Sequence, residues 1–112
     1  SFERICKQYL IRKNRKGLMD EVFKKIGKYY YDDPIEKKNG EFDIVTLDDR
    51  GYIFYEAKFR KEPVTENVVR NEIRQVEQTG LECYKYGFFS KSGFACEEEE
   101  NRILIELKEL YK

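Results

Sequence analysis

Three charged residues, Asp43, Glu56 and Lys58, interrupt two stretches of sequence that are otherwise apolar or β-branched, residues 42–47 and 52–59. A charge inside such a stretch is costly unless it has a partner or a role. The residues between the stretches, Asp48-Asp49-Arg50-Gly51, have strong turn chemistry, so the segment predicts a β-hairpin. The geometry of that hairpin decides whether the three charges meet.

The register of the hairpin sets the distance between the two carboxylates. If the four turn residues form the whole loop, Leu47 faces Tyr52 and Asp43 lies opposite Glu56, with Cβ atoms roughly 4.5 to 5.5 Å apart. At that separation both carboxylates can bind one hard cation. Lys58 projects from the same face because it lies two residues beyond Glu56. The spacing therefore predicts a site for Mg²⁺ or Mn²⁺ with an ammonium group beside it.

Two alternatives compete with this site on spacing alone. A bulge at Gly51 would slip the register by one residue and set Asp43 against Ala57, which removes the carboxylate pair. The pattern Glu-x-Lys also occurs three times in this charge-rich chain, starting at Glu36, Glu56 and Glu106. Only the triplet at Glu56 interrupts an apolar strand. From the spacing, a functional site and an exposed sheet edge are equally supported.

The elements that must position these residues can be predicted from periodicity and turn signals. We expect one α/β domain over residues 1–112, with a central mixed β-sheet of about four strands flanked by helices in the order α-β-β-β-α-β-α. The predicted elements are a helix over 2–12, a short helical or irregular piece ending near Gly27, strands over 28–33, 42–47 and 52–59, a helix capped by Thr65 with the buried stripe Val69, Ile73 and Val76, a strand over 83–89, and a final helix that starts in the run Glu97 to Glu100 and carries Ile103, Leu104, Leu107, Leu110 and Tyr111.

The composition limits the chemistry that the chain can perform. It has no histidine, and its three cysteines, Cys6, Cys83 and Cys96, are widely spaced, which argues against a zinc site and against a histidine-based triad. Reduced cytoplasmic thiols that pack as small hydrophobic groups are the favoured interpretation. The 22 basic and 22 acidic residues cancel, so nucleic-acid binding would need a local basic patch. No signal peptide or membrane span is predicted.

Asp43, followed after one hairpin by Glu56-Ala57-Lys58 in this order of elements, resembles the PD-(D/E)XK nuclease superfamily. The segments Phe-Glu-Arg-Ile-Cys, Glu-Phe-Asp-Ile-Val, Tyr-Glu-Ala-Lys-Phe and Phe-Phe-Ser-Lys-Ser-Gly-Phe are similar to a domain of unassigned function at the C-terminal end of archaeal and bacterial AAA-type ATPases. The resemblance implies a restriction-endonuclease-like core. Phe42 departs from the superfamily pattern, since a proline often precedes the metal-binding aspartate.

The resemblance also implies roles for further residues. An acidic residue on the first helix often completes the site in the superfamily, and Glu3 matches that position. The metal would be held by Asp43, Glu56 and the carbonyl of Ala57, with Lys58 at the reacting phosphate. Gln75 and Gln78 match a helical glutamine of some relatives only loosely, and surface amides are the favoured interpretation. We expect the DNA backbone to contact four basic residues, Arg60, Lys61, Lys13 and Arg15.

The expected function is that of a metal-dependent DNA endonuclease-like domain that hydrolyses phosphodiester bonds. Because the chain starts at Ser1 and not at Met, we expect a fragment that follows an ATPase domain in a longer cytoplasmic protein. One alternative is a catalytically silent module with the nuclease fold that serves the ATPase. Another is a stand-alone, homodimeric restriction or junction-resolving nuclease.

Overall fold

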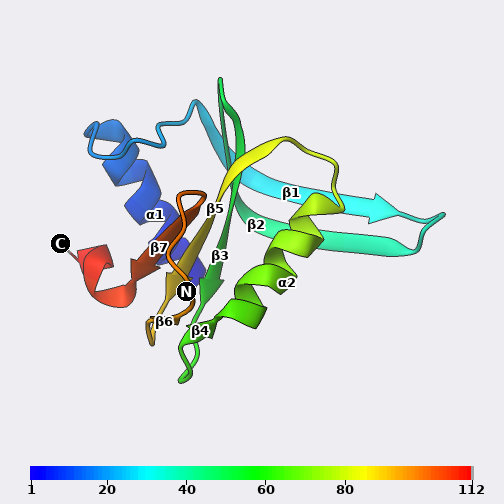
Figure 1. The fold of residues 1–112 in the computed structure, drawn as a ribbon. Coiled ribbons are helices and arrows are strands. Elements are labelled where there is room, and N and C mark those ends of the chain that lie inside the picture. The colour runs from blue at the N-terminus through cyan, green and yellow to red at the C-terminus, as the bar shows by residue number, and fades with distance from the viewer. Residues whose placement is uncertain (112) are drawn as a thin grey trace.

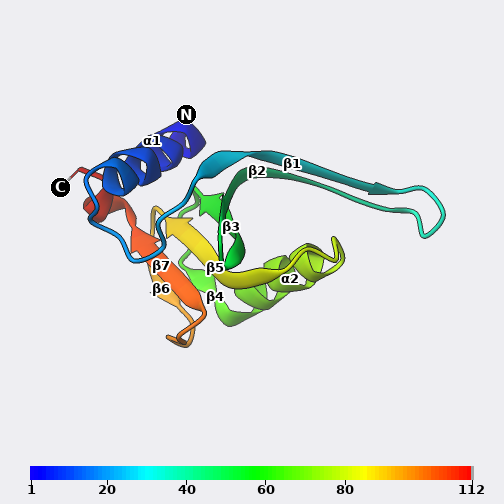
Figure 2. The ribbon, with the colours of Figure 1, turned by 90° about the horizontal axis from the view of Figure 1, so that it is seen from above.

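The computed structural model describes residues 1–111 and contains a five-stranded mixed sheet with one helix on each side (Figures 1 and 2). The strand order is β1-β2-β3-β5-β7; β1, β2 and β3 pair antiparallel, and β3, β5 and β7 pair parallel. The predicted α/β class with a mixed central sheet is confirmed. The elements are α1 (Phe2–Arg15), β1 (Lys25–Asp33), β2 (Lys38–Asp48), β3 (Gly51–Lys58), β4 (Val64–Thr65), α2 (Glu66–Glu77), β5 (Cys83–Ser90), β6 (Phe94–Ala95), β7 (Arg102–Glu106) and a 3₁₀ helix η1 (Leu107–Tyr111).

Helix α1 covers one face of the sheet. Its start is fixed by Ser1, whose hydroxyl accepts a hydrogen bond from the Arg4 backbone N–H at 3.2 Å. Cys6 and Leu10 lie one helical turn apart and are fully buried against the sheet. On the sheet, alternate residues of β2 and β3 supply this half of the core, including Ile44, Ile53 and Tyr55.

Helix α2 covers the opposite face and provides the crossover between the parallel strands β3 and β5. Thr65 caps it as predicted, because its hydroxyl accepts a hydrogen bond from the Val68 backbone N–H at 3.3 Å. Val69 and Val76 of the predicted stripe are buried, and they pack against Phe54 and Phe88 from the strands. The two faces of the sheet therefore have separate cores.

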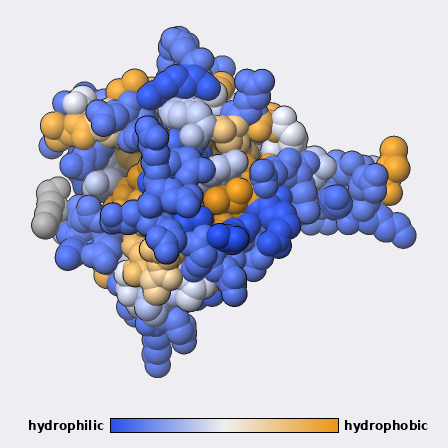
Figure 3. Space-filling model, in the orientation of Figure 1, coloured by the Kyte–Doolittle hydropathy of each residue, from blue (hydrophilic) through white to orange (hydrophobic). Residues whose placement is uncertain are grey.

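Strands β1 and β2 form a long ribbon that extends beyond the body of the sheet (Figures 1 and 2). Residues 38–40, which lie outside the predicted strands, belong to β2, and the turn is confined to residues 34–37. The segment before β1, over residues 18–24, is irregular and not helical. The tip of the ribbon bears Ile35, which is 90% exposed. Figure 3 shows a small hydrophobic patch at the end of the ribbon.

The prediction of a final helix starting in the Glu97 to Glu100 run is wrong. Residues 102–106 form β7, which pairs parallel with β5, and only the five residues of η1 are helical. The apolar side chains alternate: Ile103 and Ile105 pack on the α1 side, and Leu104 packs on the α2 side. Pairing with a buried strand outweighs the helical spacing that the same residues display.

Charged groups attach α2 to β7. The Arg102 side chain is 4% exposed and donates two hydrogen bonds to the Glu66 carboxylate, at 2.8 and 2.7 Å. Glu66 also accepts a hydrogen bond from the Glu97 backbone N–H at 3.1 Å. Hydrogen bonds from Arg102 and then from Arg70 hold the pKa of the Glu66 carboxyl well below its usual value of 4.5. This ion pair explains why the Glu97 segment lies against the first turn of α2.

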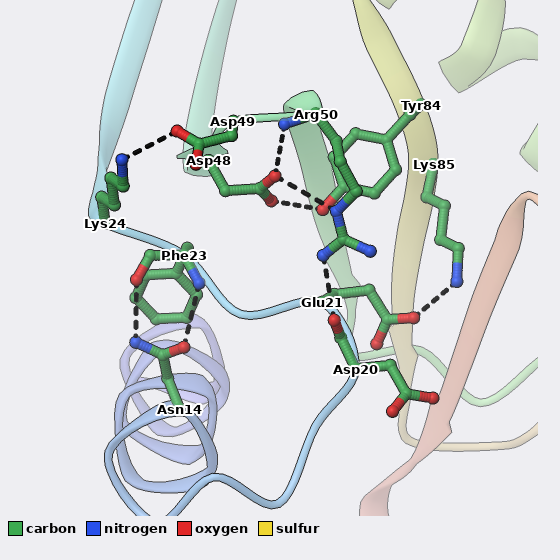
Figure 4. A network of polar contacts seen from close by, with 10 residues as sticks. All are labelled: Asn14, Asp20, Glu21, Phe23, Lys24, Asp48, Asp49, Arg50, Tyr84 and Lys85. Carbon is green, nitrogen blue, oxygen red and sulfur yellow. Dashed lines mark hydrogen bonds and ion pairs between the residues drawn. The ribbon is translucent and has the colours of Figure 1, made fainter.

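A second polar network fastens the irregular segment to the end of the sheet where β3 begins (Figure 4). Tyr84 donates a hydrogen bond to Asp48, and the Arg50 guanidinium lies 4.7 Å from the centre of the Tyr84 ring. Arg50 also donates to the carbonyl of Asp20 at 2.9 Å, and Lys85 pairs with Glu21 at 2.5 Å. This end of the sheet is therefore closed by compensated charges.

Two further findings concern predictions from composition. The three cysteines are free, and Cys6 is buried while Cys83 and Cys96 are partly buried. Over residues 1–111, no helix has the length and apolar character needed to cross a membrane.

Candidate functional site

The predicted site lies where β2 separates from β3. Leu47 pairs with Tyr52, so the predicted register is confirmed and the one-residue slip is excluded. The recorded pairs run to Ile44 and Tyr55, and Asp43 and Glu56 are the next residues beyond that pair. Lys58 closes the parallel pairing of β3 with β5, opposite Ser90. The acidic pair is thus at the carboxyl end of β3, where a parallel sheet commonly presents its ligands.

A β-bulge in β2 determines the position of Asp43. Between the pairs Gly27–Val45 and Tyr29–Phe42, the single residue Lys28 of β1 lies opposite both Asp43 and Ile44 of β2. The ammonium group of Lys28 lies 3.8 Å from a carboxylate oxygen of Asp43, whose side chain is 35% exposed. Bulges are frequent beside active sites because they redirect one side chain. Here the affected residue is the candidate metal ligand.

Glu3, the predicted fourth member, reaches this cluster from α1. Partial burial, followed by a hydrogen bond and charge repulsion from Asp43, raises the pKa of the Glu3 carboxyl above its usual value, and the charge of Glu56 adds to the effect. Lys28 acts in the opposite direction. The first turn of α1 therefore brings a carboxyl group to Asp43, as the resemblance implied.

Lys58 and Glu56 project from the same side of β3. The Lys58 ammonium lies 3.6 Å from a Glu56 carboxylate oxygen, and the two side chains are 20% and 31% exposed. The carbonyl of Lys58 accepts a hydrogen bond from the Lys91 backbone N–H at 3.0 Å, which ties the loop after β5 to the end of β3. Ala57 packs with the α1-side core, so the residues alternate as expected for a strand.

Glu72 of α2 belongs to the same cluster and was missed by the sequence reasoning. Burial, followed by repulsion and a shared hydrogen bond with Glu56, raises the pKa of the half-buried Glu72 carboxyl to about 7, and Lys58 partly offsets this. A signal was present in the sequence, because Glu72 lies three residues after Val69 and four before Val76. That spacing places it on the buried stripe of α2, an unusual position for a charge.

The donor atoms of the cluster are oxygens. Carboxylates and backbone carbonyls are the hard ligands that suit Mg²⁺ and Mn²⁺, and Mg²⁺ commonly uses one or two carboxylates together with water. Asp43, Glu56 and the Ala57 carbonyl would meet that requirement. Among the side chains at positions 1–111, no three Asp, Glu, Cys or His groups already converge as a metal-binding set.

The remaining predicted residues divide by position. Arg60 and Lys61 are exposed in the loop directly after β3, beside the cluster. Lys13 and Arg15 lie in the last turn of α1, at the opposite end of the helix from Glu3. Ten residues of helix separate Glu3 from Lys13, a rise of roughly 15 Å. Of the four basic residues, only Arg60 and Lys61 therefore lie near the site. Gln75 and Gln78 are exposed on α2, in agreement with surface amides.

Comparison with known proteins identifies a family that covers most of the chain. A family described as archaeal and bacterial proteins of unknown function matches residues 1–79, a range that contains every member of the carboxylate cluster together with Lys58. No curated protein and no solved structure matches the chain. The match agrees with the archaeal and bacterial resemblance found in the sequence, and the nuclease activity stays a prediction.

Proposed function

We propose that this chain, which belongs to the DUF234 family of archaeal and bacterial proteins, is a metal-dependent nuclease domain that hydrolyses phosphodiester bonds in DNA. The observation that carries the proposal is the position of Asp43 and Glu56 at the carboxyl end of β3, where the Lys58 ammonium lies 3.6 Å from Glu56. From the two helices, Glu3 and Glu72 come close enough for these carboxylates to raise their pKa values. Carboxylates that repel one another destabilise the fold, so an arrangement of this kind is expected at a site that binds a cation.

The residues would divide the work as follows. Asp43, Glu56 and the Ala57 carbonyl would hold Mg²⁺ or Mn²⁺, which supplies a Lewis acid and a bound water of lowered pKa. Lys58 is mostly buried and adjacent to Glu56, so its ammonium group would stabilise the negative charge that develops on the phosphate oxygens. Glu3 would accept a proton or hold a water at the outer side of Asp43. Arg60 and Lys61 would contact the DNA backbone next to the scissile bond.

A second function is favoured by one observation. Lys28 and Lys58 already pair with Asp43 and Glu56, at 3.8 and 3.6 Å, so lysines of the chain itself compensate the carboxylates. This supports a silent interaction module of an attached ATPase. Location in the cytoplasm and the preceding ATPase domain are parts of the same proposal, supported by the free cysteines and by the sequence resemblance respectively.

The experiment compares the wild type with Asp43→Ala and Glu56→Ala, and Glu41→Ala serves as the matched control because it is exposed on the same strand as Asp43. With Mn²⁺ or Mg²⁺, we expect cleavage of plasmid and branched DNA that falls roughly 10²-fold or more in the two site variants and not in the control. Mn²⁺ should also raise the melting temperatures of the wild type and of Glu41→Ala, but not those of the two site variants. Equal cleavage by wild type and Asp43→Ala would refute the nuclease assignment. Absence of any Mn²⁺-dependent shift would favour the silent module.

A further inference from the structure

An exposed aromatic ring lies directly beside the proposed site. Phe59 follows Lys58 in the sequence and is 60% exposed. Its ring stacks on that of Phe2, with centroids 5.0 Å apart and planes inclined by 25°. Phe2 precedes Glu3, so the pair joins the residues that flank two members of the site. Stacking fixes the orientation of an exposed ring, whereas a single solvent-facing phenylalanine has no fixed orientation.

A cationic group lies over this ring. The Lys91 ammonium lies 4.6 Å from the centre of the Phe59 ring. Lys91 is held there because its backbone N–H donates to the Lys58 carbonyl, and the adjacent Ser92 hydroxyl donates to the carbonyl of Arg60. Arg60 and Lys61 are exposed on the loop that follows β3. The carboxyl ends of β3 and β5 thus present an aromatic ring with one ammonium group over it, and two exposed basic residues follow that ring in the sequence.

An open cavity continues from Lys91 along the same edge of the sheet. It has a volume of about 500 Å³, and its lining includes Ser92, Lys108 and Tyr111. Tyr111 is 71% exposed, and Glu106, which also lines the cavity, is paired with Lys108 at 3.3 Å. Beyond the candidate active site, the edge therefore offers a second accessible ring and one further basic group, Lys108, whose charge is paired with that of Glu106.

Single-stranded nucleic acid fits this combination. Its bases are free to stack on an aromatic side chain, whereas the bases of a duplex are already stacked on one another. Phe2 and the Lys91 ammonium lie against the Phe59 ring, so a base would stack there as Lys91 moves from the ring to a phosphate. We propose that Phe59 and Lys91 bind an unpaired nucleotide next to the scissile phosphate, so that the substrate is DNA with a single-stranded segment, such as an overhang or a flap. This inference rests on the proposed nuclease function, whose site it extends.

The test measures binding without cleavage. Fluorescence anisotropy with EDTA present would follow a labelled oligothymidylate of about 15 nucleotides, a duplex of the same length and an oligouridylate. The wild type is compared with Phe59→Ala, Phe59→Trp, Lys91→Ala and the control Tyr30→Ala, since Tyr30 is an aromatic residue 66% exposed on the distant ribbon. Thermal unfolding of each variant shows that it is folded.

We expect the single strand of DNA to bind at least tenfold more tightly than the duplex, and Phe59→Ala to weaken that binding by roughly 5- to 100-fold. Phe59→Trp and Tyr30→Ala should bind like the wild type, and Lys91→Ala should reduce the salt dependence by about one phosphate contact. Equal affinity for single strand and duplex, tighter binding of the oligouridylate, or unchanged binding by Phe59→Ala would each overturn the inference. The two proposals can fail separately. If the chain prefers single-stranded DNA in the binding assay but the wild type cleaves no DNA with Mg²⁺ or Mn²⁺, only the nuclease function is refuted.

Discussion

Glu72 occupies a position in which its negative charge is unfavourable. Burial against the sheet and the nearby Glu56 carboxylate raise its pKa to about 7, and Lys58 only partly compensates. The folded protein therefore keeps the Glu72 proton up to about pH 7, whereas the unfolded chain releases it near the usual value of 4.5. The contribution of this group to stability is thus fully present below about pH 4.5 and lost as the pH rises through 7.

We predict that Glu72→Gln stabilises the chain at pH 8 and not at pH 5. The amide cannot ionise, so the variant avoids the penalty that the wild type carries above pH 7. Thermal unfolding in metal-free buffer should show a melting temperature roughly 4–8 °C above that of the wild type at pH 8. Glu77→Gln is the control, because Glu77 is exposed on the same helix. The same gain at pH 5 would mean that the charge of Glu72 has no part in the effect.

Individual site residues differed in how far the sequence could reveal them. Asp43, Glu56 and Lys58 could be predicted from the sequence because each interrupts an apolar strand and the turn fixes their register. The bulge that redirects Asp43 was not, since it depends on how β1 pairs with β2 around Lys28. Glu72 was hidden because α2 is distant in sequence from β3, and only the fold brings it to Glu56.

Among the elements, the strands β1, β2, β3 and β5 were predictable and the edge strand β7 was not. The hairpin of β2 and β3 and the cap of α2 are set by local chemistry at residues 48–51 and Thr65. Residues 102–106 carry both alternation and helical spacing, and their pairing with β5 decides between them. A segment whose local pattern fits two structures is settled by its tertiary partner.

Close contact between β3 and β5 gives a prediction at Gly87. A Cβ atom at this position would lie 2.1 Å from a carbon of the Tyr55 ring, which is 4% exposed and packs against Phe89. Gly87→Ala should therefore destabilise the fold by about 1–3 kcal/mol or more, although alanine loses less backbone entropy than glycine. Gly27→Ala is the matched control in β1, since the added Cβ would meet no atom of the described residues within 4 Å apart from its chain neighbours. Urea unfolding measures both, and equal stability of the two variants would contradict the contact.

On the scale of the whole molecule, the two ends of the sheet have different electrostatics. At the end where β3 begins, Asp48, Arg50 and Tyr84 compensate one another (Figure 4). At the carboxyl end of β3, Asp43 repels Glu3 and Glu56 repels Glu72, and the nearby lysines only partly offset this repulsion. The charges at the carboxyl end of β3 lower the stability of the fold, and those at the other end raise it. This distribution is expected when the carboxyl end of β3 has a function.

The ribbon of β1 and β2 gives the last prediction. Beyond the bulge, the pairs from Tyr29–Phe42 to Asp33–Lys38 have no third strand among residues 1–111, because the pairing of β2 with β3 runs only as far as Ile44. Two-stranded segments are marginal in water, and such segments open locally at low free-energy cost. Tyr29 and Tyr31 still pack beside Phe54 and Val76, so we expect protection to decrease toward the tip.

Amide hydrogen exchange followed by mass spectrometry would measure this gradient. Peptides covering residues 32–39 should exchange within seconds to minutes, while those covering 44–47 and 86–89 should stay protected near the global limit. Replacing Pro34-Ile35-Glu36-Lys37 with Asn-Gly should leave the melting temperature unchanged within about 2 °C, because the tip residues contribute little to either core. Uniform protection along the ribbon would instead mean that another surface covers it in solution, with the exposed Ile35 at the centre of that contact.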